Sequence, residues 1–131
     1  MSIGYDLDWV ICRDLRPYEQ RLTKCPKLLL RYKSFFKKLF TPQEDAVIIT
    51  WRPIQDKKET IKRLRKNGID NEIYFNRWKP STNNAIRTKE LRIKALRLDK
   101  FYESDKQQAK QLKKLCPSCK ILVFNHTKWK K

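Results

Sequence analysis

The chain has 131 residues, 40% of them apolar, and its 32 Lys and Arg residues outnumber 14 Asp and Glu residues to give a net charge of +18. A chain of this length fits a single domain over residues 1–131 that buries about two-thirds of its surface, which excludes wholesale disorder. The apolar runs are far shorter than the roughly 20 residues of a membrane span, and no charged segment followed by an apolar one opens the sequence, so we expect a cytoplasmic protein without membrane contact or secretory signal.

Short apolar runs alternate with amphipathic segments along the chain, a pattern typical of a parallel sheet covered by helices. The apolar runs predict five strands, at residues 2–8, 46–50, 72–75, 100–103 and 120–124. The runs AVIIT and KILVF do not alternate with polar residues, as expected of strands that are buried on both faces. We therefore predict an α/β fold, a three-layer Rossmann-like domain with a five-stranded, mostly parallel sheet flanked by helices.

The spacing of apolar residues between these strands predicts four helices, at residues 27–40, 57–67, 86–98 and 105–115. Asp56 and Glu59 resemble a capping box at the start of the second helix, and Gly68 supplies a stop after its end. Residues 9–26 form the only long irregular stretch, and long loops in compact domains are often functional.

Acidic and hydroxyl side chains follow three of the predicted strands. Asp6 and Asp8 end the first strand, Thr50 ends the second, and Glu103 and Asp105 follow the fourth. Because the carboxyl ends of parallel strands meet at one edge of an open sheet, we expect these residues to converge there. Carboxylates gathered in this way need a cation among them, and oxygen ligands without histidine favour a hard ion such as Mg²⁺.

Lys94 is the basic residue that we expect beside these acids. It shares the helical spacing of Leu91 and Leu98, which predicts that it lies on the face that packs inward. Two interpretations are open. The aliphatic part of the side chain can lie on the core while the ammonium reaches water, or the ammonium can be a buried countercharge to the acids. We favour the countercharge.

Four short motifs occur in an informative order. DLDWV at 6–10 pairs two aspartates, IITWRP at 48–53 is an apolar strand that ends in Thr before Arg-Pro, IKAL at 93–96 carries a lysine, and FYESD at 101–105 is acidic. The segment 56–69, between the second and third motifs, has the pattern of a helix. Together these motifs resemble those of the haloacid dehalogenase superfamily, in its order and across most of the chain, which is a stronger signal than any one motif alone.

The resemblance implies a small member without a cap domain, acting as a phosphomonoester hydrolase through an aspartyl-phosphate intermediate. The substrate would be a phosphorylated molecule, and a nucleotide and a nucleic-acid end are the candidates. By the family's pattern Asp6 is the nucleophile, and Asp8 protonates the leaving group and then activates water. Thr50 would hydrogen-bond a phosphoryl oxygen, and Lys94 would offset negative charge.

The resemblance also implies that the cofactor is Mg²⁺ and that its ligands come from Asp6, Asp8, and Glu103 or Asp105. Asp105 is equally explained as the cap of the helix that follows it. The sequence leaves open which of the last two acids meets the metal.

Trp9 and Trp51 stand at positions where the family favours glycine, and together with Arg52 they are candidate substrate-binding residues. Three interpretations of the two indoles stay open. The indoles stack on a base of the substrate, or they block a site that has lost catalytic activity. In the third interpretation, a codon that the source organism reads as Gly was translated as Trp.

The positive charge predicts affinity for polyanions, with nucleic acid as a candidate partner, although a solvated Lys-rich surface explains it too. The alternative function is therefore a non-catalytic nucleic-acid-binding module that keeps the same fold. The four cysteines, two of them in CPSC at 116–119, are interpreted as reduced thiols rather than a zinc site. We expect the protein to be a monomer.

Overall fold

The computed structural model describes residues 2–8, 10–12, 38–79 and 81–124, and structural statements below refer to these residues. The strands are β1 (Ile3–Tyr5), β2 (Val47–Pro53), β3 (Ile73–Asn76), β4 (Lys100–Glu103) and β5 (Lys120–Val123). They form one sheet in the order β3-β2-β1-β4-β5, and every neighbouring pair is parallel. The predicted α/β fold class is confirmed, and the sheet is entirely parallel.

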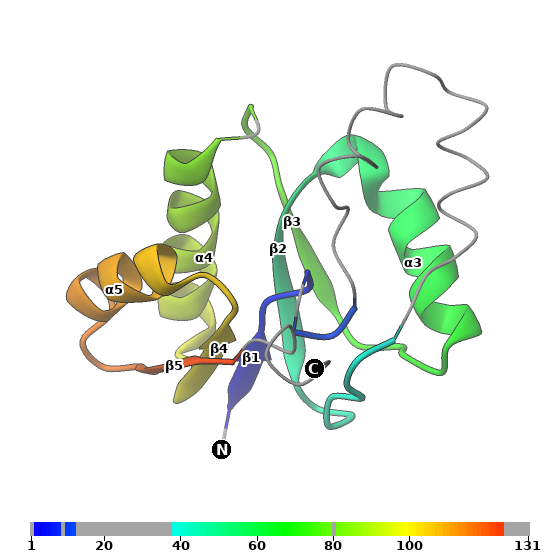
Figure 1. Cartoon of the computed structure of the whole chain (residues 1–131), viewed down its shortest axis with the longest axis horizontal. Coiled ribbons are helices and arrows are strands. Elements are labelled where there is room, and N and C mark those ends of the chain that lie inside the picture. The colour runs from blue at the N-terminus through cyan, green and yellow to red at the C-terminus, as the bar shows by residue number, and fades with distance from the viewer. Residues whose placement is uncertain (1, 9, 13–37, 80, 125–131) are drawn as a thin grey trace, which may run out of the picture.

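Three described helices cover the sheet: α3 (Lys57–Lys66), α4 (Thr82–Leu96) and α5 (Lys106–Leu115). Figure 1 shows α3 on one face of the sheet and α4 with α5 on the other, so the layers are helix, sheet and helices. Each face has its own apolar core. Leu64 of α3 packs with Tyr5 and Ile48 on the first face, whereas Ile93 of α4 packs with Phe101 on the second.

Gly4 lets the central strand lie close to the second core. A Cβ atom at this position would lie 2.6 Å from Cδ1 of Leu98, closer than real Cβ atoms come, and 3.0 Å from Cδ1 of Phe101, which is a tight contact. Glycine at this position therefore permits β1 to pack beneath Leu98, and it fixes how near the connection from α4 to β4 comes to the strand that carries Asp6.

The predicted capping box and the predicted start of the third helix were wrong, each for a local reason. Asp56 makes no side-chain capping bond, because a short 3-10 turn (η2, Ile54–Asp56) runs directly into α3. Helix α4 begins at Thr82 rather than at 86, since the Ser81 side chain accepts a hydrogen bond from the amide of Asn84 and caps the helix there. Gly68, with φ of 76°, ends α3 as predicted.

Two predictions fall mainly outside the described residues. The loop 9–26 is described only at residues 10–12, and the helix expected at 27–40 only at residues 38–40. Those three residues are not helical, and Lys38 instead forms an isolated antiparallel bridge with Cys12. None of the described helices combines the length and the apolar character that a membrane crossing requires.

Candidate active site at the carboxyl edge of the sheet

Three neighbouring strands deliver polar side chains to one edge of the sheet. Asp6 follows β1, and its backbone N–H donates to the carbonyl of Tyr102 in β4 at 2.8 Å, which aligns it with Glu103. Thr50 lies in β2 on the other side of β1. The side chains of Asp6, Thr50 and Glu103 are all buried. Polar groups that are buried together at the carboxyl ends of parallel strands are the usual setting of a ligand site in this architecture.

Lys89 of α4 supplies the cation for this edge. Its Nζ lies 2.5 Å from Oε1 of Glu103 and 3.5 Å from Oδ1 of Asp6, and it donates to Oε1 of Gln108 at 2.8 Å. The side chain is completely buried. Asp6, Lys89 and Glu103 therefore form a buried cluster of two acids and one base, which we call the Asp6 triad.

The inward placement predicted for Lys94 is wrong. Its side chain is 56% exposed and pairs with Glu90 one turn earlier on the helix surface at 2.8 Å. The prediction anchored the buried face on Leu91, which is half exposed, and started the helix four residues too late. The face that packs inward carries Ala85, Lys89 and Ile93, and their spacing of four was the signal that could have identified Lys89.

The Asp6 carboxylate is held from three sides. Its Oδ1 accepts from the backbone N–H of Leu7 at 2.9 Å and its Oδ2 from the Ser104 hydroxyl at 3.0 Å, while Lys89 lies beside Oδ1. Burial and the neighbouring charge of Glu103 raise the pKa of Asp6 to about 8, against the opposing effect of Lys89. This site therefore disfavours two ionised carboxylates beside a single ammonium.

Lys89 itself keeps its charge. Burial lowers its pKa, but the attraction of Asp6 and Glu103 outweighs burial and the net pKa is raised. With both acids ionised the Asp6 triad carries one uncompensated negative charge. A buried negative charge of this kind attracts a cation, and oxygen donors suit a hard one.

Glu103 and Asp105 have different roles in the structure. Oε2 of Glu103 accepts from the backbone N–H groups of Ser104 at 2.8 Å and Asp105 at 3.1 Å, so this carboxylate organises the turn after β4. Asp105 is exposed and caps α5, where it accepts from the N–H groups of Gln107 and Gln108. The capping alternative for Asp105 is therefore what the structure contains, and Glu103 is the acid beside Asp6.

Asp8 has a different countercharge. Arg52 binds it with two hydrogen bonds, from Nε to Oδ2 at 3.0 Å and from Nη2 to Oδ1 at 2.5 Å. The same guanidinium donates to the Thr60 hydroxyl of α3 at 3.3 Å, and the Arg52 backbone N–H donates to Oγ1 of Thr50 at 3.1 Å. The Arg52 side chain is 20% exposed, so this pair lies at the rim of the site rather than beneath it.

The four predicted metal ligands do not form one cluster. Asp6 and Glu103 share Lys89, whereas Asp8 is bound to Arg52 and Asp105 caps a helix. Within the described ranges, no three His, Cys, Asp or Glu side chains come together as a metal-binding group. The chemistry of Asp6 and Glu103, two buried carboxylates that share one base, nevertheless fits a hard divalent cation.

The aromatic candidates are only partly placed. Trp9 lies outside the described residues, and Trp51 is half-buried in β2 directly before Arg52. A third tryptophan, Trp78, follows the neighbouring strand β3. The Arg87 guanidinium lies over its ring, with Cζ 4.3 Å from the ring centroid. Trp78 therefore already has a cation on one face of its ring.

Asn76 is a site-edge residue that the sequence did not single out. It ends β3, and its Oδ1 accepts from the backbone N–H of Trp78 at 2.9 Å and from the Thr88 hydroxyl at 3.2 Å. Its Nδ2 is the one buried side-chain nitrogen or oxygen without a hydrogen-bond partner in the described part of the chain. A buried donor of this kind is costly unless water or a ligand accepts from it.

Comparisons with known proteins do not place the chain in a family. No family model, no curated protein and no solved structure matches it. Function must therefore be inferred from the contacts of the Asp6 triad, from Asp8 and Arg52, and from the order of the motifs.

Proposed function

We propose that the chain is a magnesium-dependent phosphomonoester hydrolase in which Asp6 is the nucleophile. The Asp6 triad is the observation that carries this proposal. Burying two acids and a base at the ligand edge of a parallel sheet costs stability, and such groups with shifted pKa values concentrate at functional sites. The motif order, which resembles that of the haloacid dehalogenase superfamily, supports the same reaction.

The proposed reaction assigns the two aspartates the roles that the family resemblance implies. An Asp6 carboxylate oxygen attacks phosphorus and forms an aspartyl-phosphate as the bond to the ester oxygen breaks, and Asp8 gives that oxygen a proton. Asp8 then accepts a proton from water as the water attacks phosphorus, which releases phosphate and restores Asp6. Lys89 takes the role that we expected of Lys94, because its ammonium offsets charge at the nucleophile.

Arg52 supports a second element of the mechanism. Its guanidinium holds both oxygens of Asp8, and Asp8 cannot exchange a proton with substrate while both are occupied. A phosphoryl group presents the same paired oxygen acceptors that a carboxylate does, and guanidinium binds both well. An incoming phosphate would therefore compete for the partly exposed Arg52, and the released Asp8 would take up a proton from water before it gives one to the ester oxygen.

Magnesium would supply the positive charge that lets an anionic nucleophile approach an anionic phosphate. Asp6, Glu103 and the main-chain carbonyl of Asp8 are the groups that would hold it. The raised pKa of Asp6 supports this assignment, since the two buried acids beside one ammonium lack a second positive charge.

The test is phosphate release from an aryl phosphate with Mg²⁺ present. Wild-type protein should turn over, and Asp6→Asn should lower the rate by at least about a thousandfold because the amide cannot attack phosphorus. Lys94→Met is the control, since Lys94 lies on the exposed surface of α4 and its substitution should leave the rate within about twofold. Equal rates for wild type and Asp6→Asn would show that Asp6 is not the nucleophile.

A non-catalytic nucleic-acid-binding module is the second candidate function. The occupation of Asp8 by Arg52 and the indole of Trp51 at a glycine-like position both favour it. In that case neither wild type nor Asp6→Asn would release phosphate from the aryl phosphate, while both would bind oligonucleotides with steep salt dependence.

Trp51→Gly separates the interpretations of the indole. If Trp51 blocks backbone approach to the phosphoryl group, the glycine variant should raise kcat/KM by about tenfold or more. If the indole stacks on a base, the same change should instead weaken binding of a nucleotide substrate. Unchanged kinetics with both substrates would contradict both interpretations.

A further inference from the structure

The outer surface of η2 and α3 forms a basic groove of about 860 Å³. Its basic lining residues are Lys57, Lys58, Lys62, Arg65 and Lys66, and no acidic residue lines it. All five are exposed, and Ile54 and Ile61 supply an apolar part between them. We call this surface the α3 groove.

Four of the five bases lack a carboxylate partner. Lys57, Lys58, Lys62 and Lys66 form no ion pair with any described residue, whereas Arg65 lies 3.6 Å from Asp70. The remaining base of the helix, Arg63, turns away and pairs with Glu59 at 2.8 Å. The two ion pairs found here among the described residues therefore use the arginines and leave the four lysines without a described carboxylate partner.

The lysines are also arranged unfavourably for an isolated helix. Lys58, Lys62 and Lys66 follow one another at intervals of four residues, so each lies directly beside the next along one line of the helix. Like charges at this spacing destabilise a helix, and an anion with regularly spaced charges would remove the repulsion. A helix of this length is about 15 Å long, so the row suits several successive phosphates rather than one small anion.

We infer that the α3 groove binds the sugar–phosphate backbone of a polynucleotide whose terminal phosphate enters the Asp6 site. This inference rests on the proposed function and names its substrate class. The lysines pair with backbone phosphates, and Ile54, which is 41% exposed, contacts sugars or bases together with Ile61.

The location of the groove supports a single continuous path. Helix α3 follows Arg52 through Pro53 and η2, and Arg52 itself donates to Thr60 of α3 at 3.3 Å. The amino-terminal end of α3 thus lies at the rim of the site, and the row of lysines leads away from it. A strand whose end reaches Asp6 would continue along that row.

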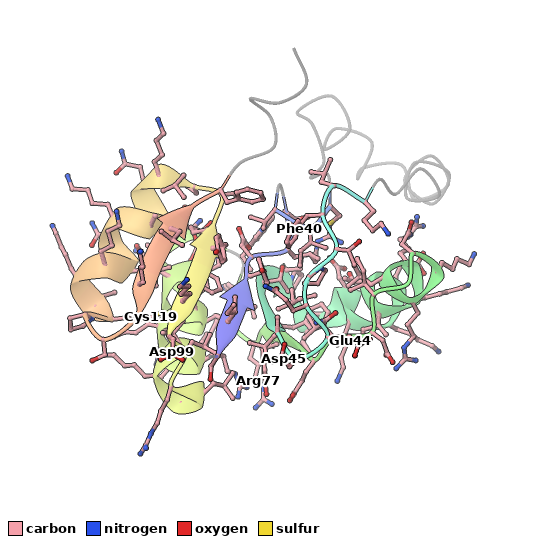
Figure 2. All side chains as sticks on the ribbon, turned by 90° about the horizontal axis from the view of Figure 1, so that it is seen from below. Phe40, Glu44, Asp45, Arg77, Asp99 and Cys119 are labelled. Carbon is pink, nitrogen blue, oxygen red and sulfur yellow. The ribbon has the colours of Figure 1, made fainter. Side chains whose placement is uncertain are left out.

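Helix α5 offers a matched control. It also has ten residues and four exposed lysines, Lys106, Lys110, Lys113 and Lys114, but it lies on the opposite face of the sheet (Figure 1). Side chains tipped with nitrogen project outward from both helical layers in Figure 2, so total charge alone does not distinguish the two surfaces. Four Lys→Gln changes on either helix lower the net charge from +18 to +14.

The experiment measures binding of a fluorescent oligonucleotide that has no terminal phosphate, by anisotropy over a range of salt concentrations. The α3 variant K57Q/K58Q/K62Q/K66Q should bind about tenfold or more weakly at 0.15 M salt, and its log–log salt slope should be shallower by about 3. The α5 variant K106Q/K110Q/K113Q/K114Q should change affinity by less than about twofold. Glutamine keeps helix propensity, and far-UV circular dichroism checks that both variants fold.

Two outcomes overturn the inference. Equal losses in the two variants would mean that binding follows net charge alone. Binding to phosphatidylserine vesicles with none to the oligonucleotide would assign the α3 groove to a membrane surface instead.

Asp6→Asn separates this inference from the proposed function. It should bind the oligonucleotide as wild type does, since the probe does not use the nucleophile. A wild-type protein that is silent on the aryl phosphate but loses oligonucleotide binding through the α3 changes would refute the hydrolase and leave the α3 groove as a nucleic-acid surface. An active protein whose α3 variant binds normally would refute only the α3 groove.

Discussion

The two aspartates of the DxD motif lie two residues apart, yet they belong to different regions of the molecule. Asp6 is tied to α4 and β4 by Lys89 and Ser104, whereas Asp8 is tied to β2 and α3 by Arg52. The cation of Asp6 is fully buried, and the cation of Asp8 is 20% exposed. The difference indicates that the cation beside Asp6 is shut away from solvent and shared with Glu103, whereas the cation beside Asp8 is partly open to solvent.

Lys89→Met should give the largest loss of stability, because it leaves Asp6 and Glu103 buried without a base. We expect the free energy of unfolding to fall by about 3–5 kcal/mol. Lys94→Met should change it by less than about 0.5 kcal/mol, since its partner Glu90 lies on an exposed helix surface. Urea unfolding of the two variants measures both values, and similar losses would contradict the assignment of Lys89 to the core.

Arg52→Met should cost less than Lys89→Met, although Arg52 makes more hydrogen bonds to its acid. Water can reach Asp8 at the rim once the guanidinium is gone, so we expect a loss of about 1–2 kcal/mol. Urea unfolding again provides the measurement. A loss as large as that of Lys89→Met would place the two aspartates in equivalent environments.

Asparagine substitutions should move stability in opposite directions at the two positions. Burial and Glu103 raise the pKa of Asp6, so the folded state at pH 7 disfavours its charge, and Asp6→Asn should raise the free energy of unfolding by about 1–2 kcal/mol. Asp8→Asn removes the bidentate pair with Arg52 and should lower it by about 1–2 kcal/mol. Thermal unfolding at pH 7 without added metal tests the pair, and a loss at both positions would contradict the strained state of Asp6.

Ser104→Ala should give a smaller effect, a loss of about 1 kcal/mol, because Oδ2 of Asp6 loses the hydrogen bond from Ser104 while Oδ1 keeps Leu7 and Lys89. Thr60→Val makes the corresponding change beside Arg52 and should cost less, since the guanidinium keeps Asp8. Chemical denaturation of both variants provides the comparison. A larger loss for Thr60→Val would show that the rim is the more rigid region.

The sheet was predictable from the sequence for a simple reason. Parallel strands that are covered on both faces are mostly apolar throughout, and the short, β-branched run AVIIT at 46–50 favours such a strand over a helix. The convergence of Asp6 and Glu103 followed from the rule that parallel strands end at one edge. These inferences need only strand identity and direction, which local sequence specifies.

The partners of the acids were not predictable in the same way. Lys89 is the middle residue of a buried row with Ala85 and Ile93, but a lysine counts as polar in an amphipathic pattern and hides that row. Arg52 was expected to meet substrate, and its pairing with Asp8 depends on how β2 and the residues after β1 come together in space. Such contacts join residues 44 positions apart, and periodicity does not encode them.

The position of β1 has a consequence for how the chain acquires its structure. The first strand of the sheet in chain order, β1, occupies its centre, and its two neighbours begin at Val47 and Lys100. During translation the segment Ile3–Tyr5 waits for most of the polypeptide before its second neighbour emerges, and such distant pairings slow folding. Any nascent chain that stops before β4 would expose one side of the central strand and leave Asp6 without Glu103 and Ser104.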